Sequence, residues 1–268
     1  MSGYVKHDHS EQVLQFFQEM QIQGIYPNAL TYVCFLKACG SLGAIEKGKE
    51  LHAHLERKGL WEKEPILGNA LVDMYVKCGC LTNAQQVFDK IPSLRSMETW
   101  TSLIAGYVEL GNGEKAIYYL EKMQQEGLFM DDVVYVCVLR ACDNPGYESK
   151  GQEIHDEIVR KELLEKDVIV GSALVDMYTK CGLLGEAWKV LEKLPIRNVI
   201  SWSSVIAGYA QAGQGHEAMN CFEQMKTKGF SPDHITYLSA LKACGVARAI
   251  DMGKNIHNEI IRQHILKE

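Results

Sequence analysis

The chain has 268 residues, 47% of them hydrophobic and 23% charged, which is enough apolar material for an ordered fold larger than one small domain. Its formal net charge of −6 argues against general binding to polyanions, because the overall field repels phosphate. No run of about eighteen apolar residues predicts a membrane span, and nine cysteines at these spacings do not fit a secreted disulfide scaffold.

Sequence segments recur along the chain at long, regular intervals. Leu-Lys-Ala-Cys at 36–39 returns at 241–244 and, with arginine in second place, at 139–142. Ile-Ala-Gly-Tyr at 104–107 returns at 206–209, an offset of 102 residues. A fixed period of this kind indicates a repeat architecture.

Aligning the aromatic-rich openings of the segments predicts one partial repeat and seven repeats of three rotating types. In chain order these are 1–28 (partial), 29–64 (long), 65–96 (short), 97–131 (standard), 132–167 (long), 168–198 (short), 199–233 (standard) and 234–268 (long). The first residues show neither a secretory signal nor a basic, serine-rich presequence. Because the chain opens within a helical pattern, we expect it to be a fragment of a longer protein.

Each repeat is predicted to contain two helices. In the standard repeat 199–233, apolar residues follow the i, i+3, i+4, i+7 spacing of an amphipathic helix in both halves. These residues are Trp202, Val205, Ile206 and Tyr209, then Ala218, Cys221, Phe222 and Met225. Gly24, Gly127 and Gly229 stand where a second helix should end in the left-handed conformation. So short a helix pair cannot bury its apolar stripes alone, so neighbouring repeats should stack into an all-α solenoid with a concave face.

Four stretches carry a family resemblance: TYVCFLKACGSLGAIEKGKELHAHL, GNALVDMYVKCGCLTNAQQVFDKIP, GSALVDMYTKCG and WSSVIAGYAQAGQGHEAMNCFEQMKTKGFSPD. They resemble the pentatricopeptide repeat family, specifically the land-plant subclass with alternating long, short and standard repeats. The resemblance covers essentially the whole chain. It implies a right-handed superhelix in a protein of the mitochondrion or chloroplast that binds single-stranded RNA, one base per repeat. It also implies a non-catalytic part of an RNA-editing or RNA-processing factor, with organellar editing cofactor proteins as further partners.

A protein-interaction scaffold is the main alternative function. The tetratricopeptide class, which binds peptides, needs a small residue one turn into the first helix, where this chain has Val72, Ile104 and Ile206. That difference favours the RNA-binding family. The net charge, together with Glu98 and Glu109 near the expected groove, favours the scaffold.

The resemblance implies that the fifth and the last residue of each repeat contact one base. The resulting pairs are Asn69/Ser96, Thr101/Asp131, Ser172/Asn198 and Ser203/Asp233, with Asn28 as the last residue of the partial repeat. An ionised aspartate only accepts hydrogen bonds, whereas an asparagine amide both donates and accepts. The family's rules then imply G for the two pairs with aspartate, A for Ser172/Asn198, and a pyrimidine, with C expected, for Asn69/Ser96.

A second role is open for the last residues, because each directly precedes a predicted helix and Asp, Asn and Ser are favoured N-caps. No cap explains a serine or threonine at the fifth position, which favours base reading there. The long repeats carry Val33, Val136 and Leu238 at their fifth positions, so direct base reading is not expected from them.

Two further sets of residues follow from the resemblance. Aliphatic second residues that would wedge between bases are Ile66, Val133, Ile169, Ile200 and Ile235, whereas Glu98 departs from that pattern. Lysines at the family's phosphate-contacting place are Lys6, Lys77 and Lys180. A lysine at a helix C-terminus also interacts with the helix dipole, and that alternative stays open.

Three motifs that suggest chemistry are rejected on their context. Gly111–Ala116 and Gly213–Ala218 mimic a dinucleotide fingerprint but follow no strand. His155–Glu157 and His257–Glu259 match the H-x-E of a zinc deaminase, but the chain has no Pro-Cys-x-x-Cys. The recurring cysteines fit small core residues. We therefore predict no catalytic or metal site, no cofactor, no small-molecule substrate and no membrane association.

Overall fold

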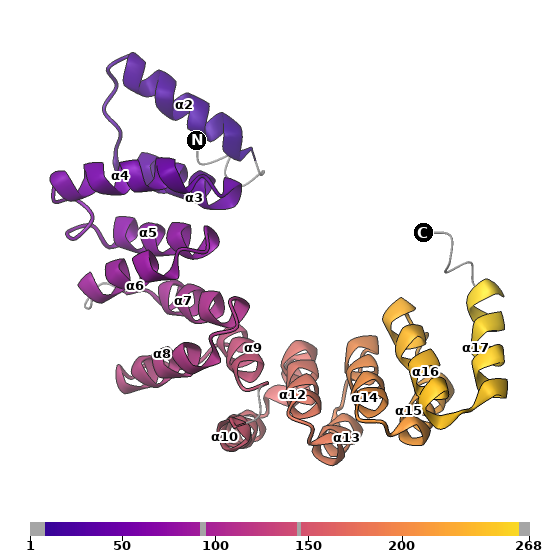
Figure 1. The fold of residues 1–268 in the computed structure, drawn as a ribbon. Helices are drawn as coiled ribbons and strands as arrows, with labels where there is room; N and C mark the ends of the chain where they lie inside the picture. The colour runs from indigo at the N-terminus through magenta and orange to yellow at the C-terminus, as the bar shows by residue number, and fades with distance from the viewer. Residues whose placement is uncertain (1–8, 92–94, 144–145, 263–268) are drawn as a thin grey trace. The chain divides into compact units, whose positions relative to one another are not determined.

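The computed structural model describes residues 9–91, 95–143 and 146–262, and over these ranges every regular element is a helix (Figure 1). Sixteen helices occur there, without a strand. The expected all-α repeat fold is therefore confirmed. The helices fall into two compact units, which divide between Met130 and Asp131.

In the first unit the helices are α2 (Ser10–Ile22), α3 (Ala29–Leu42), α4 (Ile45–Arg57), α5 (Pro65–Lys77), α6 (Leu81–Lys90), α7 (Met97–Glu109) and α8 (Gly113–Gln125). In the second unit they are α9 (Asp132–Ala141), α10 (Glu148–Arg160), α11 (Leu163–Lys166), α12 (Val168–Lys180), α13 (Leu184–Lys193), α14 (Val199–Gln211), α15 (Gly215–Thr227), α16 (His234–Ala247) and α17 (Ile250–Arg262). Each predicted repeat from residue 29 onward contains a first and a second helix, while the division into long, short and standard types stays a prediction.

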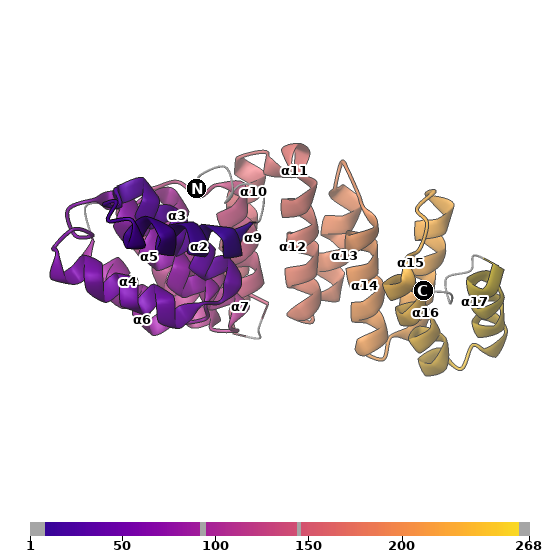
Figure 2. The ribbon, with the colours of Figure 1, turned by 90° about the horizontal axis from the view of Figure 1, so that it is seen from above.

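The first helices of neighbouring repeats pack against each other and form one layer within each unit. In the first unit α3 contacts α5 and α5 contacts α7; in the second the series runs through α9, α12, α14 and α16 (Figure 1). The second helices pack on the first helices of their own and the following repeat, so that α13 lies beside both α12 and α14 (Figure 2). Candidate residues on the first helices therefore share one layer in each unit.

Apolar stripes at the predicted positions hold the layers together. Trp202, Val205 and Ile206 are almost completely buried, and so is the corresponding Trp100 of the first unit. Close contact between first helices also requires glycine: a β-carbon on Gly208 would collide with the Thr179 side chain of the preceding repeat. Burial of these large side chains contributes about 1.5–3 kcal/mol each, so stacking of the repeats supplies most of the stability.

The second helices end as predicted, since Gly24, Gly127 and Gly229 have φ of 70°, 76° and 83°. Two residues other than glycine adopt the same left-handed backbone, Glu162 with φ 56° and Arg248 with φ 55°. Glu162 directly precedes the one-turn helix α11, which the sequence pattern does not predict (Figure 2).

Candidate functional site

The fifth residues of the repeats lie on the first helices, and we call the helix face that carries them the reading face. The last residues of the repeats lie at the N-termini of the same helices. Both kinds of residue are therefore positioned by the first-helix layer within each unit.

All five candidate last residues cap a first helix with a side-chain oxygen, so the capping role left open by the sequence is real. Each oxygen accepts from the backbone N–H three residues later, at 2.8–3.3 Å. The caps are Asn28 of α3, Ser96 of α7, Asp131 of α9, Asn198 of α14 and Asp233 of α16. Capping uses only one polar atom of an Asn or Asp side chain, so it does not exclude contact with a base.

The Ser172/Asn198 pair is brought together directly. Ser172 Oγ lies 3.1 Å from Asn198 Oδ1 and 2.7 Å from Val168 O and shares its one proton between them, while Asn198 Oδ1 also accepts from Ser201 N at 2.8 Å. Only an oxygen can accept from a backbone N–H, so these bonds fix the amide orientation and turn Nδ2 away from the cap. Within the described residues Nδ2 makes no hydrogen bond, and Asn198 is half-buried. The pair therefore presents two N–H donors.

The Ser203/Asp233 pair is joined through a third residue. Asp233 Oδ1 accepts from Thr236 N at 2.8 Å and from Thr236 Oγ1 at 2.6 Å, and Thr236 Oγ1 lies 2.5 Å from Ser203 Oγ. Asp233 Oδ2 has no partner among the described residues. The pair thus presents a carboxylate oxygen, an acceptor.

Thr236 is a site residue that the sequence analysis missed. It is fully buried and stands at the third position of its repeat. Thr31 and Thr99, at the same position, also make side-chain contacts to the preceding last residue, at 2.9 Å and 3.0 Å. A hydroxyl-bearing residue three places after an N-cap is the signal that could have identified them.

A cavity of about 630 Å³ in the first unit collects several candidates from α3, α5 and α7. It is lined by Asn69, Ser96, Ile66 and Lys77, which are two reading candidates, a wedge candidate and a phosphate candidate. Asn69 Oδ1 is buried there without a hydrogen-bond partner in the described part of the chain. A buried amide oxygen without a partner costs about 1–3 kcal/mol, and because solvent does not reach this atom, it can accept a donor from a ligand only after the amide group turns toward the cavity.

Thr101 and Asp131 belong to different units, Thr101 to α7 of the first and Asp131 to the start of α9 in the second. Thr101 Oγ1 donates to Met97 O at 3.0 Å, while exposed Asp131 accepts only the N–H of Val134, at 2.8 Å. Each of these residues is thus fixed by its own helix.

The hydroxyls at the fifth position have a structural role other than capping. Thr101, Ser172 and Ser203 each donate to the backbone carbonyl four residues earlier, at 2.7–3.0 Å. Ser172 and Ser203 are also buried, with 6% and 7% of their surface exposed. Such a hydroxyl satisfies a helical carbonyl without capping anything, so base reading at the fifth position, which the absence of a cap favoured, stays a prediction.

The predicted wedge residues are exposed aliphatic side chains near the starts of first helices. Between 43% and 63% of the surface of each is accessible, for Ile66, Val133, Ile169, Ile200 and Ile235. Leu30, the second residue of its repeat, is 63% exposed as well and was missed. Glu98, which departs from the aliphatic pattern, is exposed.

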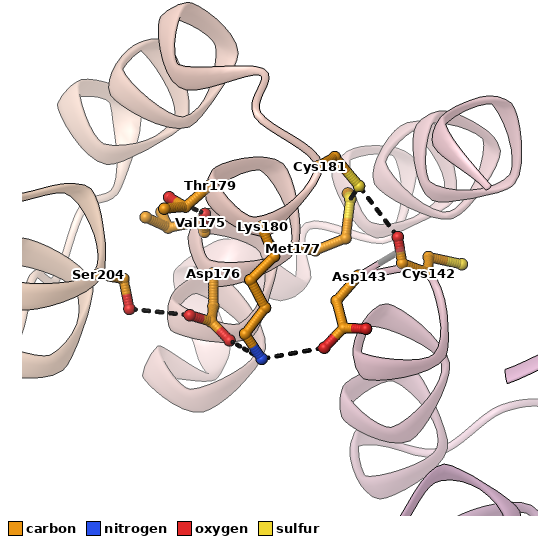
Figure 3. A network of polar contacts seen from close by, with 9 residues as sticks. All are labelled: Cys142, Asp143, Val175, Asp176, Met177, Thr179, Lys180, Cys181 and Ser204. Atoms are coloured by element: carbon orange, nitrogen blue, oxygen red, sulfur yellow. Dashed lines mark hydrogen bonds and ion pairs between the residues drawn. The ribbon is translucent and has the colours of Figure 1, made fainter. Parts of the chain in front are cut away.

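Lys180 is held by two carboxylates (Figure 3). Its Nζ lies 3.0 Å from Asp143 and 3.1 Å from Asp176, and Ser204 of the next repeat donates to the other oxygen of Asp176 at 3.0 Å. Partial burial lowers the pKa of Lys180, but the bonds to Asp143 and Asp176 raise it by a larger amount, so the pKa lies above its usual value. The ammonium group of Lys180 is therefore charged, and the two carboxylates offset its charge.

Lys77 has a similar but simpler environment, with Nζ 2.9 Å from Asp73 on the same helix. Lys6, the third predicted phosphate contact, lies outside the described residues. Each described lysine keeps at least one N–H donor for a phosphate, but its carboxylate partners offset the positive charge that a phosphate would meet.

The rejected motifs lie in structural settings of their own. His155 Nδ1 contacts Tyr178 Oη at 2.8 Å, while Glu157 accepts from Tyr135 at 2.7 Å, so the two H-x-E residues have different partners. Cys181 Sγ donates to Cys142 O at 3.0 Å across two repeats (Figure 3). Burial raises the pKa of the Cys142 thiol to about 12, so this thiol is protonated at neutral pH.

No helix in the described part of the chain is long and apolar enough to cross a membrane.

These features define a class: a tandem helical-repeat protein whose first helices carry recurring polar pairs flanked by exposed aliphatic residues. The PPR repeat family model matches residues 1–41 and 197–245, and the PPR repeat model matches 69–95, 98–128 and 172–199. The chain belongs to the pentatricopeptide repeat family.

Relatives from Arabidopsis thaliana match nearly the whole chain. Pentatricopeptide repeat-containing protein At4g18520, chloroplastic, is 35% identical over 99% of this chain and 43% of its own length. Pentatricopeptide repeat-containing protein At3g09040, mitochondrial, is 32% identical over 99% of this chain and 26% of its own length. The chain therefore spans less than half of these relatives, and family members occur in both organelles.

Among solved structures, the crystal structure of PPR10, a maize protein, in complex with an 18-nt psaJ RNA element is similar in fold. The TM-score is 0.70 at 17% identity, over 96% of this chain and 38% of that chain. At this identity the likeness concerns the fold.

Proposed function

We propose that this chain binds single-stranded RNA sequence-specifically, with the fifth and last residues of each short or standard repeat together reading one base. The observation that carries the proposal is the Ser172/Asn198 pair. Its amide oxygen is occupied twice, at 2.8 Å and 3.1 Å, and its amide nitrogen is left for a ligand. The flanking Ile169 and Ile200 are 61% and 63% exposed, so a planar base can lie between apolar side chains while the amide contacts its edge.

The chemistry of each pair supports a different base. The two N–H donors of Asn198 suit adenine, whose N1 is an acceptor on the Watson–Crick edge. The open Oδ2 of Asp233 suits guanine, whose N1–H and N2–H₂ are donors. The unpartnered Oδ1 of Asn69 suits the N4 amino group of cytosine. Thr101/Asp131 is assigned to guanine from its residue types alone, and Asn28 supplies half of another pair.

The remaining candidates have auxiliary roles in this proposal. Val133, Ile66 and Ile235 separate neighbouring bases as Ile169 and Ile200 do. Lys77 and Lys180 contact phosphates through the N–H groups that their carboxylate partners leave free, and Lys6 is assigned the same role by sequence alone.

The wider biological role is also a proposal. The repeat lengths support the land-plant subclass with long, short and standard repeats. We infer that the chain is the target-recognition array of an RNA-editing or RNA-processing factor of the mitochondrion or chloroplast, acting with editing cofactor proteins. Relatives named chloroplastic and mitochondrial support this inference.

Binding to single and double strands tests the proposal. Watson–Crick edges are unavailable in a duplex, so annealing the RNA to its complement should abolish binding. Filter binding at one fixed salt concentration compares the two forms of the same oligonucleotide. Equal affinity for both forms would rule out base reading, and no binding to either would favour a protein-interaction scaffold.

A further inference from the structure

The long repeats carry one cation each on the reading face. Their ninth residues are Lys37, Arg140 and Lys242, the basic members of the recurring Leu-Lys/Arg-Ala-Cys segment. Each stands four residues after the fifth residue of its repeat, and residues four apart lie on the same face of a helix. The side chains of all three are exposed.

These cations differ from the lysines at the ends of first helices in one decisive respect. Lys77 and Lys180 are ion-paired at 2.9–3.1 Å. In the described part of the chain, none of the three ninth-residue cations has an ion pair. Each can therefore bind an anion without breaking an existing pair.

An independent observation places one of them at the reading site. Lys37 lines the cavity of about 630 Å³ that also contains Asn69, Ser96 and Ile66. The acidic groups of that cavity are Asp73, which already holds Lys77 at 2.9 Å, and Glu98. Lys37 is thus an uncompensated cation within the same cavity as a candidate base-reading pair.

The ninth position changes its charge with repeat type. It is acidic in the short repeats, where Asp73 and Asp176 hold the helix-end lysines, and alanine in the standard repeats, at Ala105 and Ala207. Cations at this position occur only in repeats whose fifth residue is aliphatic.

The same aliphatic residues remove the capacity to read a base. Val33, Val136 and Leu238 offer no hydrogen-bonding group, and Leu238 is 70% exposed. A repeat that cannot recognise a base edge but carries a free cation on the same face is suited to a ligand of uniform charge, such as a phosphodiester.

We propose that the long repeats bind the phosphodiester backbone of the RNA through Lys37, Arg140 and Lys242 and leave base selection to the short and standard repeats. This inference rests on the proposed RNA binding. It also explains how a chain of net charge −6 binds a polyanion: free cations on the reading face act locally against the overall field.

Salt dependence of RNA binding tests the assignment. Each phosphate contact to a single strand contributes about 0.7 to the slope of log affinity against log salt concentration. The variant Lys37→Gln/Arg140→Gln/Lys242→Gln should therefore lower the slope by about 2, while each single substitution lowers it by about 0.7. Near 0.1 M salt a slope change of about 2 corresponds to roughly 100-fold weaker binding.

A matched control separates local contact from net charge. Lys58→Gln/Lys193→Gln/Lys254→Gln makes the same change in charge on second helices, at the end of α4, at the end of α13 and within α17. The control should keep the wild-type slope. The reading-face variant should keep the wild-type preference for A over G at the Ser172/Asn198 repeat while its slope falls.

The two proposals fail in distinguishable ways. If the wild-type chain binds no single-stranded RNA, the proposed function itself is wrong. If the wild type binds but the reading-face variant and the control have equal slopes, the long-repeat cations do not contact phosphate. A change in A:G preference in the reading-face variant would also overturn the division of roles.

Discussion

Exchanging Asn198 for aspartate changes one polar atom of a side chain whose surroundings are well defined. Oδ1 accepts from Ser201 N at 2.8 Å and from Ser172 Oγ at 3.1 Å, and a carboxylate oxygen can accept both bonds. The second oxygen takes the place of Nδ2. Asn198→Asp therefore keeps the helix cap, because Asp and Asn are equally good N-caps, and replaces two donors with an acceptor.

The expected effect follows from the bonds exchanged. With adenine, the variant loses the hydrogen bond that Nδ2 donates to N1, and the new carboxylate oxygen faces the N1 lone pair with a negative charge. With guanine, the new oxygen accepts from N1–H or N2–H₂ as a charge-assisted bond. A single-base discrimination is worth about 1–3 kcal/mol, so the A:G preference at that nucleotide should move towards G by that amount.

Two oligonucleotides that differ only in this base are titrated against wild type and variant by filter binding at one salt concentration. Asp233→Asn is the reciprocal control, since it should move the next nucleotide towards the 3′ end from G to A and leave the first unchanged. If Asn198→Asp weakens both RNAs equally or leaves the ratio unchanged, Asn198 is a helix cap and not a reader.

Three further predictions concern stability and are checked by urea denaturation. Burial lowers the pKa of His52 and His155 below the unfolded value of about 6.5. Their contribution to the free energy of unfolding is therefore present above that pH and is lost as the pH falls towards the folded pKa. The urea concentration at the unfolding midpoint should decrease when the pH is lowered from about 7.5 to about 5.5. The decrease should be smaller in His52→Gln/His155→Gln, and an equal decrease in that variant would contradict this prediction. Gly208→Ala should cost about 1–3 kcal/mol through its collision with the neighbouring repeat, whereas Gly185→Ala, with open space around it, should not destabilise. Arg248→Gly should stabilise by about 1 kcal/mol by relieving a left-handed backbone, and a loss of stability would refute that strain.

The fold was predictable because its signals are local and repeated. A recurring segment at an offset of 102 or 103 residues, apolar spacing such as Trp202, Val205 and Ile206, and glycine at helix ends such as Gly229 all depend on neighbours in sequence. The structure confirms the helices and the left-handed φ at these glycines. The helix α11 was missed because it follows Glu162, a residue that seldom adopts that backbone.

The candidate site was predictable only in part, because its contacts cross between repeats. Capping by Asn198 follows from residues three places apart, and it was anticipated as an alternative. The contact between Ser203 and Thr236, which are 33 residues apart, joins two repeats, and no local pattern specifies it. The bond from Lys180 to Asp143, which spans 37 residues, is tertiary in the same way.

The most direct test of sequence-specific RNA recognition is one competition by filter binding at fixed salt. A single-stranded RNA is designed with an A-G step for Ser172/Asn198 and Ser203/Asp233, and a scrambled RNA has the same composition and length. Sequence-specific recognition predicts clearly tighter binding to the designed RNA, by roughly 1–3 kcal/mol for each of these two positions at which the scrambled RNA has a different base. Equal affinity for the two RNAs would contradict it.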